Sequence, residues 1–273
     1  MPLSGRTSLI AALLLAGLIS GLFFSLIQSL EALPLLRTAE RMEHRQLERG
    51  LPPHQYHGST THSHTSEAAP PQDETGRNGA RLMSNGLLGM GYALLLGAAI
   101  LHHNRRPAAN RSHPVTGLVW GIAGYYVFYF APSLQYPPGT PATDLLRSVH
   151  DHGGVFSHQL GWITVALTSA AGLLLAVYTR GTRRLIGLLL IALPQVVLSL
   201  VERNWPALQG QGAMIRLYQL NELNYRYATD LGNLIFWLLQ GGLSALVVDR
   251  FGSEHPAGEP QPEPQSEQRL TTD

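Results

Sequence analysis

TSLIAALLLAGLISGLFFSLIQSL, residues 7–30, contains no charged side chain and decides the fold class of this chain. A membrane-spanning helix needs about 20 mostly apolar residues to cross about 30 Å of hydrocarbon, and this stretch is long enough. A signal peptide is the alternative interpretation, but no small-x-small cleavage site follows Phe24. We therefore predict an uncleaved first span near residues 8–30.

Further apolar blocks follow the first, and charged residues end them. They lie near residues 82–101, 115–131, 160–179, 185–201 and 231–248. One such block could be a buried core helix of a soluble protein, but six in one chain favour a polytopic membrane protein. We predict an all-α membrane helix bundle of about six spans over residues 1–251. The Pro-, Glu- and Gln-rich residues 252–273 are predicted to be a disordered tail.

Small residues recur inside the first two blocks at a spacing of four. Gly17 and Gly21 form one such pair, and Gly89, Ala93 and Gly97 form a series. Small residues at this spacing let the backbones of two helices approach closely in lipid. The pattern therefore indicates helix packing, although small residues are common in membrane spans.

Polar segments connect the predicted spans, and each has its own expected structure. Residues 31–49 are expected to be helical, and residues 44–81 form a long His-rich loop whose middle cannot bury enough apolar surface to fold. Four prolines make residues 131–143 an irregular loop. Residues 202–230 carry Met, Leu and Tyr among polar residues, which favours an interfacial helix.

Composition excludes several functional classes. The chain has 273 residues, no cysteine, and 19 basic residues that are all arginine, with a formal net charge of +1. This balance does not favour nucleic-acid binding, and the absence of cysteine excludes disulfides, thiolate zinc sites and iron–sulfur clusters. Without lysine there is no Walker A phosphate loop. No HExxH or GxSxG motif occurs, so the sequence does not favour an enzyme.

Imidazoles and carboxylates gather in the helix after the first span and in two predicted loops. Nitrogen and oxygen donors of this kind suit divalent ions such as Co²⁺, Ni²⁺ and Zn²⁺. The candidate metal ligands are Glu40, Glu43, His44, His54, His57, His62, His64, Asp144, His150, Asp151 and His152. The alternatives are a solvated His-rich linker, ordinary loop histidines, and a polar helix face paired with Arg37, Arg41 and Arg45. Amides inside the spans, such as Asn85, could line an ion path or hydrogen-bond neighbouring helices.

Arginine placement predicts the orientation. Arg105 and Arg106 follow the second block, and Arg183 and Arg184 lie in the short turn before the fifth. Short cytoplasmic loops carry an excess of basic residues, so both termini are predicted to be cytoplasmic. The polar stretch of residues 31–81, which carries six arginines, then lies outside. All candidate metal ligands fall on that outer side.

Several short motifs, taken in order, resemble a known family. They are PLLRTAERME at residues 34–43, GLVWGIAG at 117–124 leading to Ala131 and Pro132, ALP at 192–194, and NLIFW at 233–237. Over most of the chain up to about residue 251, this order resembles the CbtA-like probable cobalt transporter subunits, a bacterial membrane family. Gln195 departs from the pattern, because the resemblance leads us to expect a histidine there.

The resemblance implies cobalt uptake across the bacterial inner membrane, in connection with cobalamin synthesis, and a small single-span, His-bearing partner subunit. It implies no permanently bound cofactor: the divalent metal, Co²⁺ with Ni²⁺ or Zn²⁺ as alternatives, is the cargo. Two other hypotheses remain open at this point. One is a membrane-tethered metal sensor or buffer that transports nothing. The other is a membrane oxidoreductase, which the absence of a mid-span histidine for haem disfavours.

Overall fold

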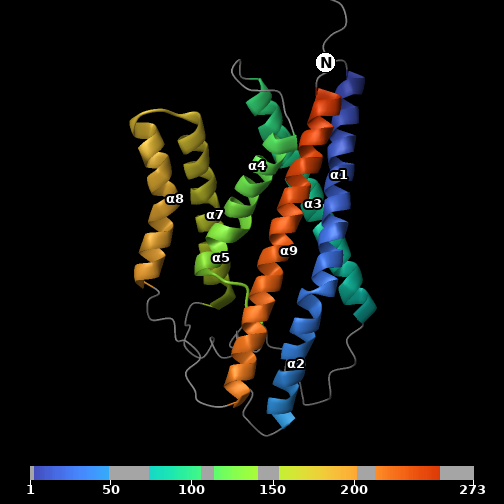
Figure 1. The fold of residues 1–273 in the computed structure, drawn as a ribbon, viewed down its shortest axis with the longest axis vertical. Helices are drawn as coiled ribbons and strands as arrows, with labels where there is room; N and C mark the ends of the chain where they lie inside the picture. Colours follow the sequence, from blue (N-terminus) through green and yellow to red (C-terminus); the bar gives the residue numbers. More distant parts are fainter. Residues whose placement is uncertain (1–2, 49–73, 106–113, 141–153, 202–212, 253–273) are drawn as a thin grey trace, which may run out of the picture.

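A computed structural model of the chain describes residues 3–48, 74–105, 114–140, 154–201 and 213–252 (Figure 1). These residues form helices and no strand, which confirms the all-α class. The elements are α1 (Leu3–Leu30), α2 (Ala32–Glu48), α3 (Glu74–Asn104), α4 (Pro114–Tyr125), the π-helix η1 (Tyr126–Phe130), α5 (Ala131–Gln135), α7 (Gly154–Tyr178), α8 (Thr182–Val201) and α9 (Ala213–Gly252).

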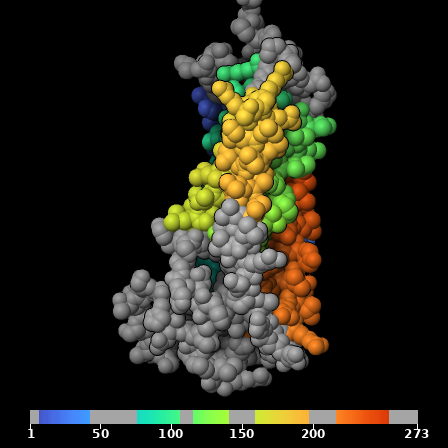
Figure 2. Space-filling view, turned by 90° about the vertical axis from the view of Figure 1, so that its left-hand side faces the viewer, coloured from blue at the N-terminus to red at the C-terminus, as the bar shows by residue number. Residues whose placement is uncertain are grey.

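Among the described residues, five helical stretches are long and apolar enough to cross a membrane. They are Thr7–Leu30, Gly76–Asn104, Val115–Gln135, Gln159–Tyr178 and Arg216–Gly252. The chain is therefore a multi-pass membrane protein. The remaining predicted span, residues 185–201, falls within α8, which is not among the five, so the prediction of six spans stays a prediction. Figure 2 shows α8 on the outer face of the bundle, where Leu185, Leu188, Leu189 and Leu193 are exposed.

Helix α9 is the centre of the bundle and contacts α1, α2, α3 and α4. One apolar cluster joins Leu13 of α1, Ile100 of α3 and Val248 of α9. A second, aromatic cluster surrounds the buried Trp237, whose ring stacks on Phe128 at 5.5 Å between centroids. Burial of such large rings contributes strongly to packing, and both clusters fix α9 between the first three spans.

Small residues bring α1 and α3 into backbone contact, as their spacing predicts. A methyl group built on Gly89 would overlap the carbonyl oxygen of Gly17 and would lie 3.0 Å from the amide nitrogen of Gly21. Only glycine leaves room for two backbones this close. The interpretation of the four-residue spacing as a packing signal is therefore confirmed.

Helices α7 and α8 form an antiparallel pair at one side of the bundle (Figure 1). Gly181 in the turn between them has a φ of 62°, a left-handed conformation that glycine adopts without steric cost. Its carbonyl oxygen accepts a hydrogen bond from the backbone N–H of Arg184 at 3.1 Å. The pair joins the rest of the bundle through η1 and α5.

The predicted irregular loop at residues 131–143 is wrong at its start, because Ala131–Gln135 is helix α5. Proline lacks an N–H and its ring clashes with the carbonyl of residue i−4 inside a regular α-helix. Here Pro132 stands in the first turn of α5, directly after the wider π turn of η1. A first-turn position needs no N–H donor from proline, so the helix continues through it.

The prediction of a helix within residues 202–230 is confirmed for residues 213–230, but the prediction of a separate interfacial helix is wrong there. Residues 213–230 continue without interruption into the last span as α9, which has 40 residues. No proline interrupts this stretch, and at 1.5 Å per residue it is about 60 Å long, about twice the hydrocarbon thickness. The His-rich loop is shorter than predicted, since residues 44–48 belong to α2 and 74–81 to α3.

Candidate functional site

Helix α2 packs along the first half of α9, beyond the end of α1 (Figure 1). We call α2 and residues 213–230 of α9 the juxtamembrane pair. Ala39 and Tyr218 are buried between the two helices, with Met42 packed against them. The side-chain amide of Asn221 donates a hydrogen bond to the carbonyl oxygen of Leu35 at 3.2 Å. These contacts fix the face of α2 that carries Glu40.

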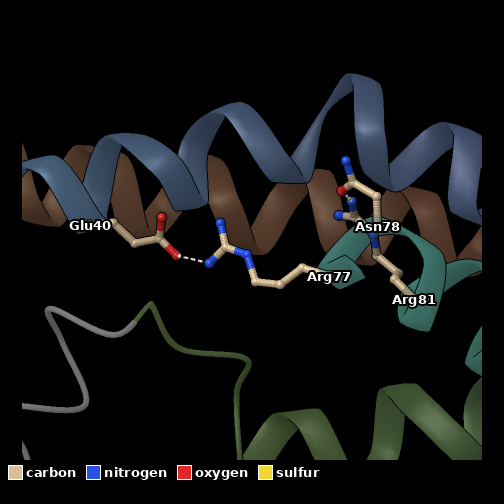
Figure 3. Close-up of polar contacts among 4 residues, drawn as sticks. All are labelled: Glu40, Arg77, Asn78 and Arg81. Carbon is tan, nitrogen blue, oxygen red and sulfur yellow. Dashed lines mark hydrogen bonds and ion pairs between the residues drawn. The ribbon is translucent and has the colours of Figure 1, made fainter. Parts of the chain in front are cut away.

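Glu40 forms an ion pair with the first turn of α3. Its carboxylate lies 3.5 Å from the guanidinium of Arg77, and Figure 3 shows the two side chains reaching toward each other from different helices. One turn further along α3, Arg81 donates a hydrogen bond to Asn78 at 2.5 Å. Both partners of the ion pair are partly exposed, at 33% for Glu40 and 45% for Arg77. Such a pair contributes about 0–1 kcal/mol, so a cation can displace the guanidinium at little cost.

The structure describes Glu40 best among the predicted metal ligands. Glu43 and His44 lie on α2, but their side chains are outside the described residues. The others also lie outside them: His54, His57, His62, His64, Asp144, His150, Asp151 and His152. In the described part of the chain no group of three or more His, Asp or Glu side chains is placed to hold a metal. The metal site therefore stays a prediction.

The ends of the helices that flank these segments do lie at one end of the bundle. The end of α2 and the start of α3 flank residues 49–73, while the end of α5 and the start of α7 come before and after residues 141–153 (Figure 1). The opposite end holds the start of α1, the turn between α7 and α8, and the end of α9. The two predicted ligand-bearing segments thus leave the bundle on the same side.

Buried amides join α1 and α3 just inside that end. The amide nitrogen of Asn85 donates hydrogen bonds to the hydroxyl of Ser25 at 2.9 Å and to the side-chain oxygen of Gln28 at 2.7 Å. Deeper in the bundle, the Ser20 hydroxyl donates to the side-chain oxygen of Gln240, whose amide donates to the carbonyl oxygen of Gly89 at 3.3 Å. Polar side chains from α1, α3 and α9 therefore follow one another along the central contact.

A separate amide contact ties α8 to α5. Gln135 donates to the side-chain oxygen of Gln195 at 3.0 Å, and Gln195 donates to the carbonyl oxygen of Ala131 at 2.8 Å. Gln195 occupies the position where the resemblance leads us to expect histidine. In the structure it serves as a helix–helix contact. The sequence pointed to amides within the spans but did not identify their partners Ser20, Ser25 and Gln135, which lie on other helices.

Asp230 is a further polar group, which directly precedes the apolar residues 231–248. Its carboxylate accepts a hydrogen bond from the Tyr129 hydroxyl at 2.7 Å. Tyr129 belongs to η1, within the candidate span Val115–Gln135. The only signal in the sequence was an acidic residue next to an apolar block.

Comparison with protein families decides where the chain belongs. The family described as "Probable cobalt transporter subunit (CbtA)" matches residues 6–249, nearly the whole chain. The chain belongs to the CbtA family. No curated protein and no solved structure gives a significant match.

Membership of the CbtA family bears out the resemblance of the short motifs. The family description names a subunit of a transporter, not an enzyme, and the word subunit implies a partner. The matched residues include all five candidate spans up to the last turns of α9. The bundle and the polar contacts within it are therefore those of a CbtA protein.

Proposed function

We propose that this CbtA chain is the membrane subunit of a divalent-metal uptake system whose cargo is Co²⁺, with the termini in the cytoplasm of a bacterial cell. The family match over residues 6–249 carries the proposal. Arg105 follows the end of α3, and Arg183 and Arg184 stand in the first turn of α8. Both helix ends lie at the end of the bundle that holds the N-terminus (Figure 1), which supports the orientation.

Capture begins with Glu40, Glu43 and the histidines of the first loop and of residues 150–152. Imidazole and carboxylate together bind Co²⁺ through nitrogen and oxygen. The Glu40–Arg77 ion pair holds the carboxylate in place while no metal is bound, and its exposure lets an arriving cation compete with the guanidinium. The captured ion then passes to the bundle.

Passage requires that oxygen ligands replace the water around the ion, since bare charge is not tolerated in hydrocarbon. The side-chain oxygens of Gln28, Asn85, Ser20 and Gln240 line the contact between α1, α3 and α9 at successive depths. Their hydrogen bonds to one another would have to open as the ion passes. A partner protein or an ion gradient supplies the energy.

The test is metal accumulation in cells. Cells that express the chain should accumulate more Co²⁺ than cells with an empty vector, in a medium that also offers Ni²⁺ and Zn²⁺, as measured by mass spectrometry. Replacing both Glu40 and Glu43 by alanine should lower uptake several-fold at low external Co²⁺. The matched control is Glu31→Ala, an exposed carboxylate at the junction of α1 and α2. Unchanged uptake in the double variant removes Glu40 and Glu43 from the mechanism.

A further inference from the structure

Asp230 is a carboxylate for which the described residues supply no cationic partner. Among those residues its single polar contact is the hydrogen bond from Tyr129. The nearest arginine on the same helix, Arg226, is one turn away and pairs with Glu222 at 2.5 Å. In this part of the chain, therefore, no cationic side chain forms an ion pair with Asp230.

The depth of Asp230 makes this unusual. Tyr129 precedes the end of the third candidate span, Gln135, by six residues, about 9 Å along a helix. On the other side, Asp230 leads directly into the apolar residues 231–248. Ionisable side chains at membrane depth are costly unless they are paired or bind ions, and they mark ion pathways.

The surroundings supply further oxygens from two elements. The π turn of η1 carries Tyr129, and π turns are frequent at functional sites. One turn beyond Asp230, and on the same side of α9, Asn233 uses its amide N–H to bond the carbonyl oxygen of Thr229 at 2.9 Å. Among the described residues the amide oxygen of Asn233 has no hydrogen-bond donor. Carboxylate, phenol and amide oxygens together are a hard donor set that suits a divalent cation.

We propose that Asp230, held by Tyr129 and assisted by Asn233, binds the divalent cation at the outer mouth of the bundle. This inference rests on the proposed transport function and assigns it a second cation site, in addition to Glu40, Glu43 and the loop histidines that capture the ion. The position fits a transfer step, because Asp230 lies in α9 where the juxtamembrane pair ends and the apolar residues 231–248 begin. One carboxylate binds weakly enough for release, which conduction requires.

Helix–helix attachment is the competing explanation, since a tyrosine–aspartate hydrogen bond also joins α9 to η1. The two explanations differ for Asp230→Asn. The amide oxygen still accepts the Tyr129 hydrogen bond, so a purely structural role survives, whereas the negative charge that binds a cation is lost. Asp249→Asn is the matched control, because Asp249 is an exposed carboxylate near the other end of the same helix.

The first measurement is initial Co²⁺ uptake at equal amounts of membrane-inserted protein. We expect at least a tenfold loss for Asp230→Asn and less than a twofold change for Asp249→Asn. For Tyr129→Phe, which leaves the carboxylate but loosens it, we expect a higher apparent KM with little change in maximal rate. Uptake by Asp230→Asn equal to that of the unchanged protein overturns the proposal.

A second measurement does not depend on transport. The purified full chain in detergent is treated with a hydrophobic carbodiimide, which modifies carboxyl groups in apolar surroundings, and labelled peptides are quantified by mass spectrometry. We expect Co²⁺ to protect Asp230 and to leave labelling of Asp249 unchanged. Labelling of Asp230 that is insensitive to Co²⁺, or that responds only to pH, overturns the proposal. If the chain accumulates no Co²⁺ in cells yet Asp230 is protected, transport fails as a function and the cation site stands.

Discussion

Replacement of Gly89 by alanine tests the contact on which the central bundle depends. The added methyl would lie 3.0 Å from the amide nitrogen of Gly21, 3.1 Å from the carbonyl carbon of Gly17, and closer still to the oxygen of that carbonyl. Optimal contacts between such atoms are about 3.5–4.0 Å. All three atoms are backbone, so no rotamer change relieves the overlap, and α1 and α3 must separate by about 1 Å or more.

The same helix offers a matched control. Gly91 is exposed, and a methyl built on it meets nothing within 4 Å. Alanine is favoured over glycine in a helix by about 1 kcal/mol, and this gain is common to both positions, so it cancels in the comparison. Overpacking costs about 1–3 kcal/mol. Gly89→Ala should therefore be about 1–3 kcal/mol less stable than Gly91→Ala, which is about 5- to 150-fold in the unfolding equilibrium constant.

The assay is titration of the purified chain from mild detergent into SDS, with tryptophan fluorescence as the readout. Trp237 is buried against α3 and α4, so separation of the helices changes its surroundings. We expect a lower midpoint for Gly89→Ala and an equal or higher midpoint for Gly91→Ala, both relative to the unchanged chain. Equal midpoints for the two variants would refute the close approach of α1 and α3.

Three further predictions concern the buried amides and the first loop. Gln240→Leu removes the contacts to Ser20 and to the carbonyl oxygen of Gly89; in the same titration we expect a loss of about 0.6–1.7 kcal/mol, and an unchanged midpoint would contradict it. Deletion of residues 54–64 should lower uptake at low Co²⁺ and spare it at high Co²⁺, whereas a metal buffer would lose function at both. Because only neutral imidazole binds metal, uptake at low Co²⁺ should fall as pH drops through about 6.5, and the deletion should flatten this dependence.

The sequence predicted the features that depend on local composition. Apolar length predicted the five candidate spans, and the small residues at 17, 21 and 89 predicted a helix contact, because both signals lie within single apolar blocks. It did not predict that α9 runs unbroken through Asp230 and Arg226. Charges within a few residues of an apolar block look like a boundary, yet the α-helix continues through both of them.

Side-chain contacts between residues distant in sequence could not be predicted from the sequence. The phenol of Tyr129 meets Asp230 across 101 positions, and Glu40 pairs with Arg77 instead of with an arginine of its own helix. Such pairings depend on how helices are arranged, which a single sequence does not encode locally. The prediction of a loop at Pro132 was wrong for a related reason. Proline disrupts the middle of a regular α-helix, but here a π turn directly precedes α5.

Because α9 is one unbroken helix, a movement of its outer part is transmitted to the bundle. Its outer part, residues 213–230, is about 27 Å long, and no proline or irregular turn forms a hinge between it and the bundle. A tilt of about 10° about Asp230 would swing the tip by about 5 Å over that length. A partner protein that binds residues 213–230 would thereby also move Gln240, which lies on the other side of Asp230 in the same rigid helix.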